Sequence, residues 1–358
     1  MRVIISAGGT GGHIYPAISI INKIKEKNPD AKFLYIGTTD RMEKDIIPNL
    51  GIDYEGIKIK GLSKNPIILF KSLTYTFSAI GKCKKIIKNF KPDIVIGVGG
   101  YVTFPVIYAA KKLGIKTVLH EQNSIPGKSN RMLSKYADTI CVSMESSMKY
   151  FNHSNVVYTG NPRGEEVLKG KKINKEELGF SKEKKLVLIT TGSLGSESVN
   201  QKLIELLPKF ENKNYEVLFV TGKSSYEQYR KYNYYKNVKI VEYLDNMKDV
   251  LKTVDLIISR AGATTIAEIT SLGIPSILIP SPYVANNHQE VNALDMANHG
   301  ACILIKEKDL TSEVLESSID MLFNDIDVYN KMKDDSKMLG VSDSASRIYK
   351  EIEKLLRW

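Results

Sequence analysis

The chain begins, after Met1 and Arg2, with Val3-Ile4-Ile5-Ser6-Ala7-Gly8-Gly9-Thr10-Gly11-Gly12-His13-Ile14-Tyr15-Pro16, and the architecture follows from this segment. The apolar residues 3–5 are typical of a buried parallel strand. Four glycines within five positions come next, and without Cβ atoms their backbone N–H groups can face an anion. Pro16 and residues 17–24 favour a helix, whose N-terminus carries positive partial charge. The segment therefore predicts a strand, a phosphate-binding loop and a helix in succession.

The glycine loop differs from two familiar phosphate-binding loops. The nucleoside-triphosphatase loop ends in Gly-Lys-Ser/Thr, whereas Gly12 is followed here by His13. The dinucleotide fingerprint is incomplete, because Ile14 occupies the place of its third glycine and the nearest acid after the second predicted strand, Asp40, comes late. His13 ends the loop and is the only side chain there that takes a proton near neutral pH, which makes it a candidate general base. A tight strand-to-helix turn with an exposed histidine is the structural alternative.

The composition is that of a globular protein without disulfides. At 358 residues the chain is long enough for two domains, each with its own core. Cys83, Cys141 and Cys302 are far apart and in no metal-ligand spacing, which favours reduced cysteines of a cytosolic protein. No signal-peptide apolar region precedes the first strand, so we expect no export. The longest uncharged run, residues 94–110, is broken by three glycines and a proline and predicts strand, loop and helix rather than a membrane span.

Strand-like runs alternate with helical segments along the chain. The first cycle holds runs at residues 3–5, 33–36, 94–98, 117–119 and 139–142, and the second holds runs at 186–189, 217–220, 256–258 and 276–279. The second cycle also opens with a glycine loop, Thr190-Thr191-Gly192-Ser193-Leu194-Gly195. This alternation predicts the α/β class, with two Rossmann-like doubly wound domains. Because such folds bind ligands at the carboxyl ends of their strands, we expect a cleft where the two glycine loops meet.

The domain boundary is expected at Gly160-Asn161-Pro162, where Asn-Pro breaks the chain before a polar linker. We predict an N-terminal domain of residues 1–160 and a C-terminal domain of residues 161–342. A C-terminal helix of residues 343–358 is expected to pack back on the first domain.

The positive charge is concentrated in the first half of the chain. Residues 1–160 hold 23 Lys and Arg against 11 Asp and Glu, a net charge of +12, whereas the remainder holds 28 against 29, a net charge of −1. Lysines without an intervening acid fill the stretch between Glu55 and Asp93: Lys58, Lys60, Lys64, Lys71, Lys82, Lys84, Lys85, Lys88 and Lys91. We interpret them as a positive surface field.

Apolar residues lie among these lysines: Pro66-Ile67-Ile68-Leu69-Phe70, Leu73, Phe77 and Ile80. An apolar face rimmed by lysine suits an anionic membrane surface, and this is the partner that we favour. A core helix with a solvated lysine face is the alternative. Nucleic acid is not expected as a partner, because the stretch lacks aromatic residues at stacking intervals and the chain has no nucleic-acid motif.

Two polar clusters of the first domain follow predicted strands. One is the glycine turn Gly97-Val98-Gly99-Gly100-Tyr101, and the other is His120-Glu121-Gln122-Asn123. Four consecutive hydrogen-bonding side chains suit a sugar with many hydroxyl groups. A metal ion suits them less, because adjacent residues of an extended segment point apart, and no metal is expected.

The richest cluster of the second domain is Ser259-Arg260-Ala261-Gly262-Ala263-Thr264-Thr265-Ile266-Ala267-Glu268. Its small residues allow close approach to a helix N-terminus, where backbone N–H groups can hold a diphosphate. Glu268 lies about one turn inside this helix, so its carboxylate can bind two vicinal ribose hydroxyls. A helix-capping acid is the alternative. Asn286-Asn287-His288-Gln289 gathers further amides after the strand at 276–279.

Taken together, these motifs resemble the MurG family of peptidoglycan GlcNAc transferases. The matching segments, in order, are Gly8 to His13, Gly99-Gly100-Tyr101, His120 to Asn123, Gly160-Asn161-Pro162-Arg163, Ser259 to Thr264 and Asn287-His288-Gln289. The resemblance covers nearly the whole chain. It implies a two-domain glycosyltransferase B (GT-B) fold, an inverting transfer of GlcNAc from UDP-GlcNAc to lipid I without metal or cofactor, and peripheral attachment to the cytoplasmic side of the cell membrane. The chain departs from the family's Gly-Gly-Ser-Gln-Gly-Ala at Leu194, where the glutamine is missing.

The same resemblance assigns site residues. It implies that the second-domain donor site for UDP-GlcNAc consists of Arg163, Ser193, Leu244, Ala263, Thr264, Thr265, Ile266, Ala267, Glu268 and Gln289, completed from the first domain by Thr10, Gly11, Gly12 and Asn123. Tyr101 is also placed among the substrate-binding residues. The glycine loop and the lysines of the first domain are left for the lipid-linked MurNAc-pentapeptide acceptor, with His13 as the base and Glu121 as the next candidate.

Three other functions remain open from the sequence. One is another UDP-sugar enzyme of the GT-B fold that transfers the sugar to a glycolipid. A nucleotide-sugar epimerase of the same fold would also bind a UDP-sugar, but it has no need of an apolar stretch rimmed by lysine. A non-catalytic scaffold at the membrane would not require His13 together with Glu268.

Overall fold

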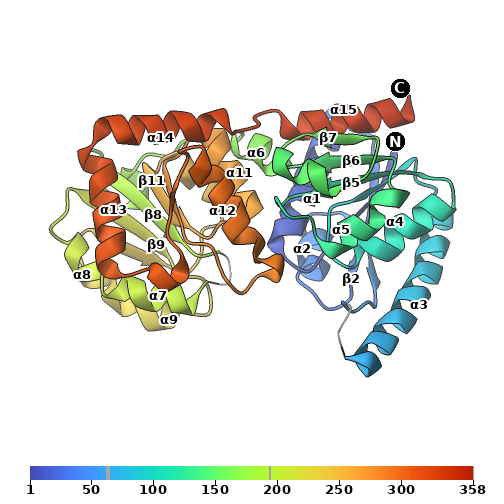
Figure 1. Cartoon of the computed structure of the whole chain (residues 1–358), viewed down its shortest axis with the longest axis horizontal. Helices are drawn as coiled ribbons and strands as arrows, with labels where there is room; N and C mark the ends of the chain where they lie inside the picture. Colours follow the sequence, from blue (N-terminus) through green and yellow to red (C-terminus); the bar gives the residue numbers. More distant parts are fainter. Residues whose placement is uncertain (62–64, 193–194, 358) are drawn as a thin grey trace. The chain divides into compact units, whose positions relative to one another are not determined.

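The computed structural model describes residues 1–61, 65–192 and 195–357, with the backbone alone for 66–69 and 71 (Figure 1). The chain divides into two compact units: Met1–Arg163 with Asp343–Trp358, and Gly164–Ser342. Each unit contains a parallel sheet. The predicted α/β class with two Rossmann-like domains is therefore confirmed.

The sheet of the first unit has, among the described residues, seven strands in the order β3-β2-β1-β4-β5-β6-β7. These are β1 Arg2–Ser6, β2 Lys32–Thr38, β3 Asp53–Ile57, β4 Ile94–Gly97, β5 Lys116–Glu121, β6 Thr139–Val142 and β7 Val156–Tyr158. The chain leaves β1 toward β2 on one side and later enters β4 on the other. The topological switch point of this sheet thus lies between the loops that follow β1 and β4.

The sheet of the second unit has six strands, within the described residues, in the order β10-β9-β8-β11-β12-β13. These are β8 Lys185–Thr190, β9 Tyr215–Val220, β10 Val238–Val241, β11 Leu256–Ser259, β12 Ser276–Leu278 and β13 Ile303–Leu304. Its switch point lies between β8 and β11, so the loop after β8 and the cluster after β11 end at the same edge.

Helices connect the strands of both units. In the first unit they are α1 Gly11–Lys27, α2 Glu43–Asn49, α3 Pro66–Phe90, α4 Thr103–Lys112, α5 Lys128–Leu133 and α15 Ser344–Leu356, and α6 Pro162–Val167 crosses the boundary. In the second unit they are α7 Glu197–Ile204, α8 Leu207–Phe210, α9 Tyr226–Tyr229, α10 Met247–Leu251, α11 Ala263–Leu272, α12 His288–Asn298, α13 Ser312–Asn324 and α14 Ile326–Met338. Short 3-10 turns are η1 Ser134–Tyr136, η2 Glu145–Tyr150, η3 Glu176–Leu178, η4 Arg230–Tyr234, η5 Ala285–Asn287 and η6 Glu307–Asp309.

Both faces of the first sheet are buried. Val3 and Ile5 of β1 face the cluster formed with α1 and α15, whereas Ile4 between them faces the cluster formed with α3 and α4. This alternation is the period of two expected of a strand, and burial on both faces explains why β1 is apolar throughout its middle. Ile348 and Ile352 carry α15 into the first of these clusters, so the C-terminal helix is part of this core.

Helix α1 begins earlier than predicted. We placed its start at Pro16, but it begins at Gly11, with Thr10 as the N-cap. The carbonyl oxygen of Thr10 accepts hydrogen bonds from the backbone N–H groups of His13 at 3.1 Å and Ile14 at 3.2 Å. His13 therefore lies in the first turn of a helix, which fixes its backbone more firmly than a loop would.

Candidate active site

The first unit contains two glycine-rich loops, Gly8 to Gly12 after β1 and Gly97 to Gly100 at the end of β4. They pack directly on each other at the switch point. A Cβ atom on Gly100 would lie 2.5 Å from the carbonyl oxygen of Gly8, a distance that no side chain tolerates. Thr103 Oγ1 donates to the carbonyl oxygen of Gly99 at 2.8 Å and also lies 3.3 Å from that of Ser6. The glycine-rich composition of the second loop is thus explained by close approach to the first.

His13 is held between these loops. Its Nδ1 lies 3.1 Å from the carbonyl oxygen of Gly8. Because a carbonyl oxygen only accepts, the ring donates from Nδ1, and the neutral imidazole carries its proton-accepting lone pair on Nε2. A Cβ atom on Gly99, whose φ is +103°, would lie 2.5 Å from Cδ2 and 2.9 Å from Nε2 of His13. The edge of the ring that includes Nε2 therefore lies against Gly99.

The predicted phosphate-binding loop offers fewer N–H groups to an anion than its four glycines suggested. The N–H of Gly9 donates to Oε2 of Glu43 at 3.3 Å, so this group points toward a carboxylate rather than an incoming anion. Thr10, Gly11 and Gly12 supply the N–H groups at the N-terminus of α1, where the first turn has no intrahelical acceptors. An anion site at this loop thus rests on the helix N-terminus.

Glu43 is the residue of this site that the sequence did not reveal. It lies in the first turn of α2 and is completely buried. Its Oε1 accepts from the N–H of Thr38 at 3.1 Å and from Thr38 Oγ1 at 2.7 Å. A signal was available, because Glu43 follows the second strand, where dinucleotide folds carry their ribose-binding acid. Here the carboxylate points into the protein instead.

The predicted sugar-binding cluster after β5 is largely internal. His120, Glu121 and Gln122 are buried, and only Asn123 is half-exposed. Gln122 Nε2 donates to the carbonyl oxygen of Val98 at 2.6 Å and to Nδ1 of His120 at 3.1 Å. Burial lowers the pKa of His120 to about 4, so its ring is neutral at physiological pH. These side chains therefore hold neighbouring loops together, through the carbonyl oxygens of Val98 and Gly160.

Glu121, our second candidate base, has its carboxylate engaged in ordering the loop that follows β5. Oε1 accepts from the backbone N–H and the side-chain amide of Asn123, at 3.0 and 3.3 Å. Oε2 accepts from the N–H of Gly127 at 3.0 Å and from Asn130 Nδ2 at 2.9 Å. Four donors directed at one buried carboxylate favour a role in positioning Asn123 over a role as the base.

Tyr101 and Arg163 lie at the margins of the same unit. Tyr101 is half-buried and hydrogen-bonded to Arg41, and this bond raises the pKa of the Arg41 guanidinium. Arg163, which we assigned from the sequence to the second domain, belongs to the first unit. Its guanidinium carbon lies 5.8 Å from the ring centroid of Tyr15 in α1.

In the second unit, a buried arginine joins the loops at the carboxyl edge of the sheet. Arg260 forms an ion pair with Glu307 at 2.6 Å, donates to Ser196 Oγ at 2.5 Å and donates to the carbonyl oxygen of Ile279 at 3.1 Å. Ser196 is the N-cap of α7, and Ile279 follows β12. The sequence placed Arg260 in the richest cluster without a role, and the contacts give it the task of tying these loops together.

The cluster after β11 forms the N-terminus of α11, with Gly262 as the N-cap and Ala263 as the first helical residue. Ala263 and Ile266 are buried, whereas Thr264, Thr265 and Ala267 are half-exposed. Thr264 Oγ1 is buried and has no hydrogen-bond partner within the described part of the chain, so a polar group remains for a ligand at this helix end.

The remaining predicted donor residues have different environments. Glu268 is 8% exposed in α11, and Leu244 is half-buried after β10. Gln289 Oε1 accepts from the N–H of Ser281 at 2.9 Å and so also braces the loop after β12. Ser193 and Leu194 lie outside the described residues.

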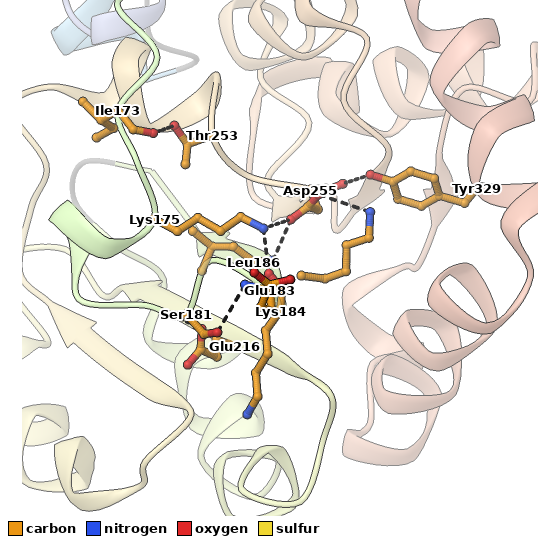
Figure 2. A network of polar contacts seen from close by, with 11 residues as sticks. Ile173, Lys175, Ser181, Glu183, Lys184, Leu186, Glu216, Thr253, Asp255 and Tyr329 are labelled. Carbon is orange, nitrogen blue, oxygen red and sulfur yellow. Dashed lines mark hydrogen bonds and ion pairs between the residues drawn. The ribbon is translucent and has the colours of Figure 1, made fainter.

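A second polar network lies at the opposite, amino edge of this sheet (Figure 2). Asp255 Oδ2 accepts from Lys175 at 2.8 Å and from the N–H of Leu186 at 2.8 Å, while Tyr329 donates to the Asp255 carbonyl oxygen at 2.8 Å. A hollow of about 450 Å³ is lined by Asp255 and Tyr329 nearby. Since ligands of doubly wound folds bind at the carboxyl edge, we interpret this network as structural.

Within the described residues, no group of three or more His, Cys, Asp or Glu side chains is arranged to hold a metal ion. Within the same ranges, none of the helices combines the length and apolar character needed to cross a bilayer.

Comparison with known families decides the assignment. The model of the glycosyltransferase family 28 N-terminal domain matches residues 3–142, and that of the family 28 C-terminal domain matches residues 186–348. The chain belongs to glycosyltransferase family 28. It is therefore a glycosyltransferase.

Individual relatives place the chain more finely within family 28. It is 47% identical over 364 residues, the full length of both chains, to a Bacillus cereus protein named UDP-N-acetylglucosamine--N-acetylmuramyl-(pentapeptide) pyrophosphoryl-undecaprenol N-acetylglucosamine transferase 1. A Pediococcus pentosaceus transferase of the same description is 42% identical over 98% of each chain. The crystal structure of Acinetobacter baumannii MurG matches with a TM-score of 0.77 and 27% identity over 99% of each chain. The resemblance to MurG is thus confirmed.

Proposed function

We propose that this family 28 enzyme transfers GlcNAc from UDP-GlcNAc to the 4-hydroxyl of the MurNAc residue in undecaprenyl-pyrophosphoryl-MurNAc-pentapeptide, converting lipid I to lipid II in peptidoglycan synthesis. The observation that carries the proposal is the full-length identity of 47% to a transferase named for this donor and this acceptor.

The second unit is proposed to bind the donor. The N-terminus of α11 offers backbone N–H groups and a positive partial charge to the diphosphate, with Thr264 Oγ1 as an additional donor. The carboxylate of Glu268, one to two turns further along α11, is proposed to accept hydrogen bonds from the ribose hydroxyls. The helix terminus then stabilises the charge that develops on UDP as it leaves, without a metal ion.

The first unit is proposed to bind the acceptor and supply the base. The acceptor hydroxyl attacks the anomeric carbon, the bond from that carbon to UDP breaks, and the hydroxyl proton passes to Nε2 of His13. The hydrogen bond from Nδ1 to Gly8 supports this role, because it leaves the lone pair of the neutral ring on Nε2. A single displacement of this kind inverts the anomeric configuration. Only the nucleophile requires a proton acceptor, so one base suffices.

Helix α3 is proposed as the contact with the cytoplasmic face of the membrane. Phe70 and Phe77, seven residues apart on the same side of the helix, are 70% and 73% exposed. Lys84 and Lys88 continue that side, whereas Cys83 and Ile87 on the opposite side are buried in the core. Exposed aromatic rings followed by lysines suit anionic lipid headgroups above acyl chains. Lys64 lies outside the described residues, and Lys82 is engaged with the carbonyl oxygen of Gly56 at 2.7 Å.

The decisive experiment combines purified enzyme with labelled UDP-GlcNAc and a short-chain lipid I analogue. We expect a disaccharide product with a β-glycosidic bond, detected by its anomeric proton coupling, and no loss of rate in EDTA. Formation of a new sugar from UDP-GlcNAc without acceptor would instead make the enzyme an epimerase, an activity carried by proteins of the same fold at 16% identity.

A further inference from the structure

The peptide bond between Gly8 and Gly9 connects a buried carboxylate to the imidazole of His13. On one side, the Gly9 N–H donates to Glu43 Oε2 at 3.3 Å. On the other, the Gly8 carbonyl oxygen accepts from His13 Nδ1 at 3.1 Å. The described residues contain no cis peptide bond, so this C=O and N–H point in opposite directions from one rigid plane. Whatever fixes the N–H therefore also aims the carbonyl group.

Glu43 is built to hold that peptide. Two hydrogen bonds from Thr38 fix Oε1, which leaves Oε2 directed at Gly9. The fit is tight, because a Cβ atom on Gly8 would lie 2.4 Å from Oε1. Glu43 is completely buried, and its charge is therefore little screened by solvent. Its acceptor atoms are directed at the end of β2 and at the glycine loop.

We propose that Glu43 is a positioning residue that acts on His13 through the Gly8–Gly9 peptide. It holds the Gly8 carbonyl group toward Nδ1, fixes the tautomer with the lone pair on Nε2, and stabilises the imidazolium that forms when His13 accepts a proton. The arrangement has the logic of the carboxylate that orients a catalytic histidine in serine hydrolases, with a peptide group inserted between the acid and the ring. Its kinetic consequence rests on the proposed role of His13 as the base, whereas its effect on the ring itself does not.

Three other titratable groups interact electrostatically with Glu43: Tyr35 on β2, Arg41 before α2 and Tyr54 on β3. Further titratable groups on the elements around His13 are Tyr101 after β4, His120 and Glu121 on β5 and Arg163 on α6. His120 interacts electrostatically with His13, but it is neutral above about pH 4, because burial lowers its pKa to about 4. Among all these groups, Glu43 is the acid that is connected to the His13 ring by one peptide group, through a hydrogen bond on each side of it.

The direct test is nitrogen NMR of histidine-labelled enzyme, with the His13 signals assigned from the spectrum of His13→Ala. In the wild type at high pH, we expect the proton on Nδ1 and an unprotonated Nε2. Glu43→Gln, which removes the charge and keeps the size, should lower the pKa of His13 by about one unit. The proposal is overturned if neutral His13 carries its proton on Nε2, or if the pKa of His13 is the same in both proteins.

The kinetic arm compares Glu43→Gln with Thr38→Val, which removes one hydrogen bond to Oε1 but keeps the carboxylate. Glu43→Gln should lower kcat about three- to tenfold, move the acidic limb of the kcat profile in parallel with the NMR value and leave the KM for UDP-GlcNAc within about twofold. Thr38→Val should lower the melting temperature and leave that limb in place. A limb that moves equally in both variants would reduce Glu43 to a structural residue.

The two arms separate this proposal from the proposed function. If Glu43→Gln changes the pKa of His13 but not the rate of transfer, Glu43 does act on the ring through the Gly8–Gly9 peptide, and His13 is not the base. If the pKa of His13 is unchanged in Glu43→Gln while turnover still depends on His13, His13 is the base and Glu43 does not position it. If Glu43→Gln does not fold, the tautomer of His13 in the wild type still tests the proposal: a proton on Nδ1 supports it, and a proton on Nε2 overturns it.

Discussion

The ring of His13 lies against the α-carbon of Gly99, where a methyl group would fall 2.5 Å from Cδ2. Gly99→Ala should therefore displace the ring and lower kcat at least about tenfold, in addition to a backbone cost of about 1–3 kcal/mol for its φ of +103°. Gly114→Ala is the matched control, since Gly114 has a φ of +73° and no atom within 4 Å of its added Cβ. Steady-state kinetics and thermal unfolding of both variants check this. Equal kcat in the two variants would contradict it.

His13→Ala should lower kcat by at least about 10² and leave the affinity for UDP-GlcNAc nearly unchanged, because the base acts only on the acceptor hydroxyl. The acidic limb of the kcat profile should disappear with it. His299→Ala, an exposed histidine at the end of α12, serves as the control. Wild-type turnover of His13→Ala across the acidic limb would rule this residue out.

Glu268→Gln should raise the KM for UDP-GlcNAc about tenfold or more, because a charged hydrogen bond of roughly 1.5–3 kcal/mol to the ribose is lost. Initial rates over a range of donor concentrations measure the effect. Glu316→Gln, on α13 with its partners Lys209 and Lys213, is the control. A donor KM that stays at the wild-type value would make Glu268 a helix-capping acid.

Changing Phe70 and Phe77 together to Ser should abolish sedimentation with anionic vesicles at moderate salt, since each buried ring contributes about 1.5–3 kcal/mol. Lys84→Ser with Lys88→Ser should weaken it by roughly 1 kcal/mol per lysine, and only at low salt. UDP-GlcNAc binding should persist in both variants. Lys231→Ser with Lys236→Ser, in the second unit, controls for charge alone. Undiminished vesicle binding by all three variants would return α3 to a core helix with a solvated face.

Acid should destabilise the first unit through His120. Burial lowers its pKa from 6.5 to about 4, so between these pH values His120 is protonated in the unfolded chain and neutral in the folded chain. The stability that the neutral ring contributes is complete above pH 6.5 and is lost as the pH falls through 4, a difference of about 3 kcal/mol. Urea-unfolding midpoints should fall less steeply over this range in His120→Gln than in the wild type. If the unfolding midpoints of the two proteins fall equally with pH, His120 is not the source of the acid sensitivity.

The sequence predicted the interior of the fold and missed its edges. All nine predicted strands are present, and the four that were not predicted, β3, β7, β10 and β13, are the outer strands of the two sheets. A central strand is covered on both faces and reads as a continuous apolar run, whereas β3 is Asp53-Tyr54-Glu55-Gly56-Ile57 and is only half-buried. Apolar periodicity is therefore a weak signal at the edges.

The sequence indicated polar residues that lie around the glycine loops of the first unit, but it did not indicate where their side chains point. The motifs identified His13, Gly99 and Gln122, but residue types do not tell whether a polar side chain faces a ligand or a neighbouring loop. Glu121 and Gln122 face neighbours. Glu43 was missed for a related reason, because its partner Gly9 is 34 positions away and no local pattern links them. Tertiary contacts supply that information.

The return of α15 to the first unit has a consequence for biosynthesis. Residues 164–342 form one uninterrupted unit and can complete their core as soon as they leave the ribosome. Most of the first unit is translated earlier, yet Ile348 and Ile352 of its core are made only after the whole second unit. The core around β1 can therefore be completed only after residues 164–342 have been synthesised, and a chain cut before α15 would keep the second unit whole but lack part of the first unit's core.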